Sequence, residues 1–217
     1  IVGHRRGAYG QRPPVQECFL RFSGESVKEL VSKANAEMSG SGCTLGTISS
    51  LQALLAHLWR AVCRARRLAP DQETTYTVLV GCLGRVGGIP ASYAGNTVEH
   101  GTAKCTARDI LDKGLGWAAW LLNEAVASFD TAYASDKLAS WPQEPRFMRL
   151  PELAAVRRVW QRLWVGQAGG RPGDKEDGLI TVFEDRGGAG SMELEVCLAP
   201  HVLARLVADQ ELMNPSV

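Results

Sequence analysis

Apolar residues recur on one side of the stretch 47–67, TISSLQALLAHLWRAVCRARR. They follow the spacing i, i+3, i+4, i+7, i+8, i+11 and i+12, which is typical of an amphipathic helix that packs on a core. The residues at these positions are Leu51, Leu54, Leu55, Leu58, Trp59, Val62 and Cys63. Ser49 and Gln52 have the spacing of a capping box at the start of the helix. We therefore expect the chain to be organised around this helix.

Arginines gather at the far end of the helix, where cationic side chains meet the negative pole of the helix dipole. They are Arg60, Arg64, Arg66 and Arg67. Such a cluster is usually a solvated helix face. His57 lies on the same polar flank, so its imidazole is expected to be solvated as well. An alternative function is that of a pure interaction module, and this basic end of the helix is the only feature that supports it.

The patterns on either side of this helix alternate between strands and helices. Alternating or β-branched runs predict strands at 15–22, 75–82, 93–98, 179–184 and 191–198. Helical spacing of apolar residues predicts further helices at 25–38, 106–113, 115–133 and 200–213. The last two strands form a hairpin, 135–151 is mostly loop, and 153–164 fits either a helix or a strand. The fold class is therefore α/β, a layered mixed sheet with helices.

A chain of 217 residues can bury a large core. Residues 1–14 are rich in Gly, Arg and Pro without a period, and we interpret them as an irregular lead-in. Residues 15–217 are expected to form one domain. The Gly-rich polar segment 166–178 is the candidate break within it.

Composition and charge exclude several classes of protein. The chain has 24 Lys plus Arg against 23 Asp plus Glu, which gives no field that would attract nucleic acid or an anionic membrane. No apolar run approaches the length of a bilayer span. Six cysteines without a CxxC pair indicate neither a zinc site nor a disulfide framework. These features predict a protein of a reducing compartment, and we expect a cytoplasmic location.

Generic catalytic motifs point to no active site. The string at 114–119, GLGWAA, matches G-x-G-x-x-A, but it follows a helical segment instead of a strand, so we interpret it as a helix–helix joint. The chain contains no P-loop, no HExxH and no G-x-S-x-G. Asp109 and Asp112 are expected to lie on a solvated helix face.

Three stretches resemble the plant BAHD acyltransferases: the central helix, YAGN at 93–96, and GSMELEVCLAPHVLARLVADQELM at 190–213. Members of that family move an acyl group from a coenzyme A thioester to a hydroxyl or amine of a small plant metabolite. The resemblance implies the fold of the C-terminal domain of these chloramphenicol acetyltransferase-like enzymes. It also implies acyl-CoA and a small-molecule acceptor as partners, with coenzyme A as a co-substrate and no bound cofactor or metal.

The family's catalytic base is the His of an HxxxD motif, because removing the acceptor proton near neutral pH suits an imidazole. The chain has four histidines, and the residue four places on is never Asp. These histidines are His4, His57, His100 and His201. We therefore assign no catalytic residue in this chain. In the family the motif lies upstream of the segment matched by 15–22, so we expect this to be the C-terminal portion of an enzyme whose missing N-terminal domain supplies the base.

The family's second motif, DFGWG, is expected between 153 and 178, where the chain reads without its Asp-Phe-Gly opening. In the family its Asp pairs with an Arg from another turn. At that turn this chain has Leu83 where relatives commonly carry Arg, while Arg85 remains. Both sides of the ion pair are therefore expected to be missing, which avoids leaving one buried charge alone.

The resemblance also places the acyl-CoA channel at the start of the central helix, where free N–H groups suit phosphate or pantetheine oxygens. Ser49 and Ser50 are the candidate coenzyme A-binding residues, and the alternative that Ser49 only caps the helix stays open. The chain is either part of an acyltransferase or a non-catalytic remnant that at most binds coenzyme A. An exposed apolar patch is expected near the central helix or the strand 75–82.

Overall fold

A mixed sheet carries the fold, with strand order β1-β6-β5-β4-β2-β3. The computed structural model describes residues 14–39, 47–84, 86–90, 92–95, 97–143, 145, 160–165, 176–184 and 190–214. The strands are β1 Gln16–Phe22, β2 Glu73–Gly81, β3 Val98–Thr106, β4 Trp160–Val165, β5 Leu179–Glu184 and β6 Met192–Leu198. The central pairs β5/β4 and β4/β2 are parallel, and the outer pairs are antiparallel. The α/β layered mixed sheet predicted from the sequence is confirmed.

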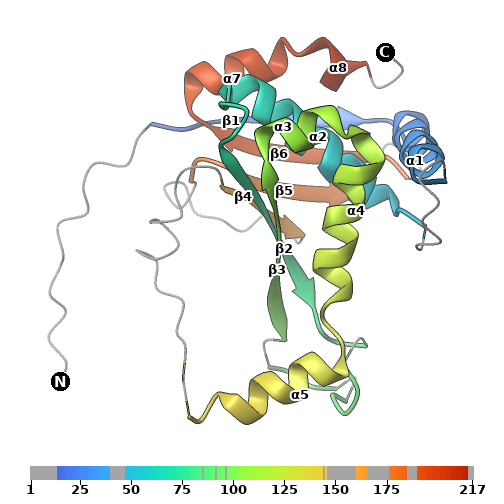
Figure 1. Ribbon diagram of the computed structural model, residues 1–217, viewed down its shortest axis with the longest axis vertical. Coiled ribbons are helices and arrows are strands. Elements are labelled where there is room, and N and C mark those ends of the chain that lie inside the picture. The colour runs from blue at the N-terminus through green and yellow to red at the C-terminus, as the bar shows by residue number, and fades with distance from the viewer. Residues whose placement is uncertain are drawn as a thin grey trace, which may run out of the picture.

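The helices pack mainly on one face of this sheet (Figure 1). They are α1 Gly24–Ser39, α2 Ser50–Arg66, α3 Ala107–Asp112, α4 Gly114–Ala127, α5 Thr131–Ser140, α7 Pro200–Val207 and α8 Gln210–Met213. The predicted central helix is α2, and it crosses the sheet. Near its middle, the Trp59 ring packs on Tyr76 of β2 with ring centroids 5.4 Å apart, and the His57 ring lies 6.4 Å from that of Phe22 in β1.

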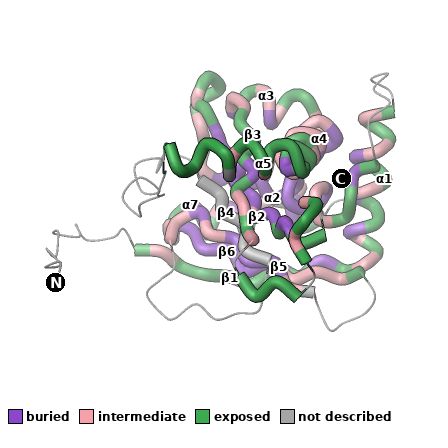
Figure 2. The backbone as a smooth tube through the Cα atoms, turned by 90° about the horizontal axis from the view of Figure 1, so that it is seen from below, coloured by how far each residue is buried: buried purple, intermediate pink, exposed green. Residues whose placement is uncertain are grey.

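Figure 2 shows that buried residues concentrate in α2 and the strands beneath it, whereas α5 is exposed. The side chains of Trp59, Leu54 and Leu58 are fully buried. They meet alternate residues of the strands, such as Leu194 and Val196 of β6, which are also inaccessible to solvent. Eleven residues of α2 are buried. A helix covered in this way by the sheet and by neighbouring helices removes a large apolar surface from water on folding.

Two predicted helices end earlier than expected, and in both cases an aspartate starts the next one. The helix predicted at 115–133 ends at Ala127, and Asp130 then caps α5 by accepting from the N–H of Tyr133 at 2.8 Å. The helix predicted at 200–213 divides at Asp209, which accepts from the N–H of Leu212 at 2.9 Å. An Asp side chain satisfies a first-turn N–H that would otherwise lack a partner, so it favours a new helix start.

Three segments differ from the prediction in the type or the bounds of their secondary structure. The strand predicted at 93–98 is wrong in its bounds, because β3 begins at Val98 and runs to Thr106. Its sequence, VEHGTAKCT, is polar because it is an edge strand with several exposed side chains. The segment predicted as mostly loop from 135 contains the second half of α5. The ambiguous segment 153–164 provides β4, a strand parallel to β2 and β5.

Several expectations fall outside the described residues. The lead-in 1–14 is described only at its last residue, and the proposed break is described only at 176–178. Arg85 also lies outside, as does most of the region expected to hold the DFGWG counterpart. Among the described helices, none is both long and apolar enough to cross a bilayer.

Candidate functional site

A capping box fixes the first turn of α2. The Ser49 hydroxyl accepts from the N–H of Gln52 at 3.3 Å, and the Gln52 side chain accepts from the N–H of Ser49 at 2.9 Å. Both Ser49 and Ser50 are exposed. Within the described ranges, no group bonds the N–H of Ser50 or Leu51. The sequence-predicted cap is confirmed, and it leaves two backbone donors and the Ser50 hydroxyl for an anionic or carbonyl oxygen.

Two asparagines that the sequence reading missed position this turn. Asn35 of α1 accepts from the N–H of Ile48 at 3.0 Å and donates to the carbonyl of Val31 at 2.8 Å. Asn123 of α4 donates to the Gln52 side-chain oxygen at 3.3 Å. The start of α2 is therefore fixed from both neighbouring helices. For Asn35, the sequence did contain a signal: this Asn follows Ala34, which is buried on the apolar face of α1. A side-chain amide beside an apolar helix face usually has a specific hydrogen-bond partner.

His57 is not solvated, contrary to the prediction. Its side chain is only 3% exposed, and its Nε2 lies 3.2 Å from the carbonyl oxygen of Leu212 in α8. Burial lowers the pKa of this imidazole, an effect that the Leu212 carbonyl and Glu211 oppose. The sequence placed His57 on a polar flank because it could not show that α8 covers that flank. His57 therefore contacts the C-terminal helix α8 from within the core.

The pKa of His57 predicts a pH dependence of folding. A His in the unfolded chain has a pKa of about 6.5, whereas the pKa of His57 in the folded protein is lower. As the pH falls below about 6.5, the unfolded state therefore binds a proton that the folded state does not bind. Stability is thus complete above that pH and falls as the pH drops through it, with a slope approaching ~1.4 kcal/mol per pH unit. We expect urea midpoints measured between pH 5.5 and 7.5 to show this loss, and His57→Gln, which keeps a donor for Leu212, to abolish it. An identical slope in His57→Gln would contradict the assignment.

Three of the four arginines predicted to form a solvated face are instead partly buried and bonded within the chain, whereas Arg67 is exposed. Arg64 makes two hydrogen bonds to the Asp209 carboxylate, at 2.8 and 3.0 Å, and Arg66 bonds Asp177 at 2.9 Å. Arg60 donates to the carbonyls of Ile110 and Leu111 at the end of α3. Burial tends to raise the pKa of the Asp209 carboxyl, but its hydrogen bonds to Arg64 and to the Leu212 N–H hold that pKa below its ordinary value. These three arginines tie α2 to distant segments, which removes the support for an interaction module.

The GLGWAA string was predicted to be a joint between two helices, but all six of its residues lie in α4, at the start of that helix. Gly116 lies where α4 meets α1, and a Cβ built on it would come within 2.5 Å of the Ala34 carbonyl oxygen. Its N–H donates to the Glu37 carboxylate at 2.6 Å. The Thr106 hydroxyl caps α3 by accepting from the Asp109 N–H at 3.1 Å, and it donates to the Asp109 carboxylate at 2.9 Å, which gives Asp109 a structural role. The string therefore presents no phosphate-binding loop.

Two cysteines near the end of α2 and of β3, Cys63 and Cys105, are poor nucleophiles. No disulfide joins cysteines of the described segments. Burial raises the pKa of the Cys63 thiol to about 11 and that of the Cys105 thiol to about 12. A thiol with such a pKa stays protonated near neutral pH and is unreactive.

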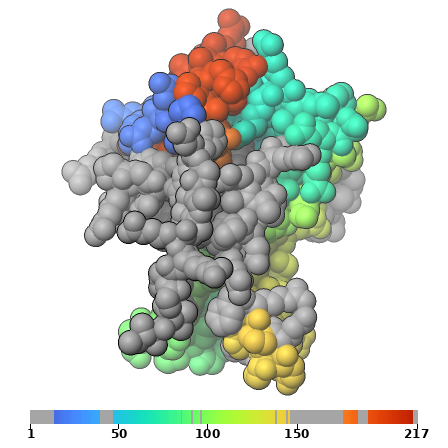
Figure 3. Space-filling model, turned by 90° about the vertical axis from the view of Figure 1, so that its left-hand side faces the viewer, coloured from blue at the N-terminus to red at the C-terminus, as the bar shows by residue number. Residues whose placement is uncertain are grey.

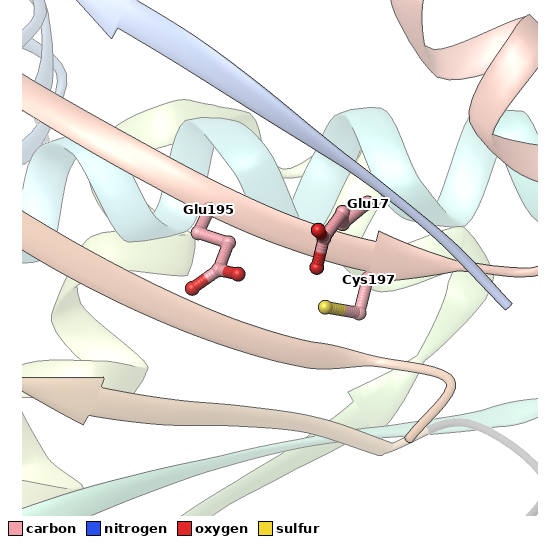
Figure 4. A group of neighbouring side chains, drawn as sticks. All are labelled: Glu17, Glu195 and Cys197. Carbon is pink, nitrogen blue, oxygen red and sulfur yellow. The ribbon is translucent and has the colours of Figure 1, made fainter. Parts of the chain in front are cut away.

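Figure 4 shows one group of potential metal ligands, on the sheet face opposite α2. Glu17 of β1 lies across from Cys197 of β6, and Glu195 is two residues away on the same strand. Their ligand atoms lie within 4.8 Å of one another. Each of these residues also interacts with other groups of the chain, so they do not present a vacant ligand set. We assign no metal site to them.

Exposed apolar side chains gather at the outer ends of β2 and β3. They include Leu83, Tyr93, Val98, Tyr133 and Trp141, each at least 37% exposed. The expected patch is therefore beyond the end of the strand predicted at 75–82 and not at α2, whose apolar face is covered within the chain. A cavity opens among these side chains between the strand ends and α5.

Comparison with known proteins decides the family. The model of the Transferase family matches residues 15–157, well over half of the chain. BAHD acyltransferase DCR of Arabidopsis thaliana is 24% identical over 215 residues, which cover 93% of this chain and 44% of that protein. This chain belongs to the BAHD acyltransferase family. It spans about half the length of the curated relatives it matches along most of its length, and the match lies in their C-terminal part.

Two further matches extend this BAHD assignment. Putrescine hydroxycinnamoyltransferase 3 of Oryza sativa subsp. japonica is 40% identical over 85 residues, which cover 39% of this chain and 19% of that enzyme. Among solved structures, F. sporotrichioides TRI101 complexed with coenzyme A and T-2 has a TM-score of 0.73 at 20% identity, covering 98% of this chain and 54% of that one. At such identity the structural match supports the fold alone.

Proposed function

We propose that this chain forms the C-terminal half of an acyltransferase that moves an acyl group from acyl-CoA to a hydroxyl or amine of a small plant metabolite. Family membership supports the reaction class, and the name of the rice relative pairs a hydroxycinnamoyl group with the diamine putrescine. The structural observation that carries the proposal is the exposed first turn of α2, with the N–H groups of Ser50 and Leu51 facing outward from a fixed cap.

In this reaction a base removes the acceptor proton while the acceptor oxygen or nitrogen attacks the thioester carbonyl. A tetrahedral intermediate forms, and it collapses by expelling the coenzyme A thiolate, which takes up a proton. The residues of this chain would contribute binding. The first-turn donors of α2 and the Ser50 hydroxyl would hold oxygens of the coenzyme, aided by the positive pole of a 17-residue helix.

The base would come from residues outside this sequence. His57 is buried against α8, and neither His57, His100 nor His201 has an Asp four residues on. We therefore expect the 217-residue chain to bind coenzyme A without transferring an acyl group. Turnover of a hydroxycinnamoyl-CoA with putrescine by the purified chain would contradict this division of roles.

Coenzyme A binding can be tested with a charge at the first turn. Ser50→Glu is expected to stabilise α2 by about 0.3–1 kcal/mol, since an anion suits a helix N-terminus, yet to weaken coenzyme A binding about fivefold because it repels phosphate. Isothermal titration at low salt measures the affinity, and urea unfolding measures the stability. Opposite signs of the two effects identify a ligand site instead of a structural cap.

The matched control is Gln210→Glu, which adds the same charge to the first turn of α8. It should leave coenzyme A affinity unchanged. Equal weakening by both variants would indicate a general charge effect. A wild-type chain that fails to bind coenzyme A at millimolar concentration would overturn the proposal and favour a remnant without coenzyme recognition.

A further inference from the structure

A cavity of about 600 Å³ lies where the outer ends of β2 and β3 meet α5. In Figure 3 these segments, green and yellow, form one end of the molecule. The cavity volume falls within the range typical of small-molecule sites, about 300–1,000 Å³. Its position at the end of the strands separates it from the first turn of α2.

Aromatic rings form much of the cavity wall. Tyr93, Phe129, Tyr133 and Trp141 all line it. Phe129 is buried and holds the Tyr133 ring edge-on, with centroids 4.9 Å apart at 82°. The other three rings remain 37–49% exposed. Large apolar side chains that stay exposed around a hollow are typical of a ligand or partner site.

Among the described residues that line the cavity, the charged groups sum to one negative charge. Glu99 and Asp130 supply two carboxylates, and Lys137 supplies one ammonium. The Lys137 Nζ lies 2.5 Å from the Glu99 carboxylate and 5.8 Å from the centre of the Tyr133 ring. The chain thus already places a cation between a carboxylate and an aromatic face, which is the environment that recognises organic ammonium ions.

We propose that this cavity holds a charged end of a polyamine, against Glu99, Asp130 and the aromatic faces of Tyr133 and Trp141. The hydrocarbon segments would lie along the apolar wall, where Val98 is 43% exposed. If the proposed acyltransferase function holds, on which this step rests, a second, uncharged amine of the same polyamine would be the acyl acceptor. A nitrogen held as ammonium has no lone pair for attack, so the acceptor needs at least two nitrogens.

The internal ion pair gives the sharpest test. Glu99→Gln and Lys137→Gln break the same contact, so a purely structural role would change binding in the same direction. Recognition of a cation predicts opposite effects. Glu99→Gln should weaken spermidine binding about threefold to tenfold, because an attractive charge is lost. Lys137→Gln should tighten it by a similar factor, because Glu99 is released and a repelling charge is removed.

The experiment uses the 217-residue chain without any acyl-CoA. Spermidine is titrated by calorimetry at low salt, and 1,8-octanediol, a neutral molecule of the same chain length, is titrated in parallel. We expect binding of spermidine only, with opposite shifts in the two variants and weakening in Tyr133→Leu. Thermal melts establish that each variant is folded.

Equal affinity for octanediol, or shifts of the same sign in both charge variants, would overturn the inference. Because coenzyme A is absent, its failure is distinguishable from failure of the proposed function, which depends on the first turn of α2. Loss of coenzyme A binding with retained spermidine binding would leave the cavity assignment intact.

Discussion

Replacing Trp59 with alanine is expected to destabilise the fold by about 3–5 kcal/mol, a large part of the 5–15 kcal/mol that typically holds a domain together. Trp59 is fully buried at the crossing of α2 and β2, so the change leaves a cavity between helix and sheet. Its Nε1 donates to the Thr74 hydroxyl at 2.8 Å, and that acceptor would lose its partner. Urea unfolding followed by circular dichroism measures the loss.

Two controls separate this effect from the general removal of an aromatic ring. Trp141→Ala deletes the same side chain at a position 37% exposed, and we expect a cost below about 1 kcal/mol. Tyr76→Phe removes a buried hydroxyl that has no hydrogen-bond partner among the described residues, so stability should stay equal or rise. A Trp59→Ala variant no less stable than Trp141→Ala would show that α2 is not the centre of the core.

Gly116→Ala is expected to destabilise the protein by about 1–3 kcal/mol, although alanine is the better helix former by about 1 kcal/mol. The new Cβ would lie 2.5 Å from the Ala34 carbonyl oxygen and 3.0 Å from the Glu37 side chain, so α1 must move away from α4. Because the obstructing atom is backbone, no rotamer change relieves the contact. Thermal and urea midpoints measure the effect.

The same displacement should reach the candidate site. Asn35, one residue beyond Ala34, fixes the N–H of Ile48 just before α2 begins. We therefore expect Gly116→Ala to weaken coenzyme A binding at temperatures where the variant is still folded. Gly81→Ala is the control, because a Cβ at Gly81 meets nothing within 4 Å. A stabilised Gly116→Ala variant would contradict the close contact of α1 with α4.

Much of the site was accessible from sequence because its causes are local. The capping box at Ser49 and Gln52 depends on residues three apart, and the structure reproduces both of its hydrogen bonds. The cavity was not predicted, because its wall combines the loop after β2, the start of β3 and residues in and around α5. Exposed side chains from such separate segments carry no shared periodic signal.

The sequence by itself determined the central helix, its cap, the strands that flank it and the resemblance to the BAHD family. All of these follow from spacings within a few residues or from strings of letters. Tertiary structure alone decided the roles of His57 and Arg64, because their partners, Leu212 in α8 and Asp209 at its N-cap, lie 155 and 145 residues away in the chain. A polar flank becomes buried only when a distant helix packs on it, and no local pattern encodes that event.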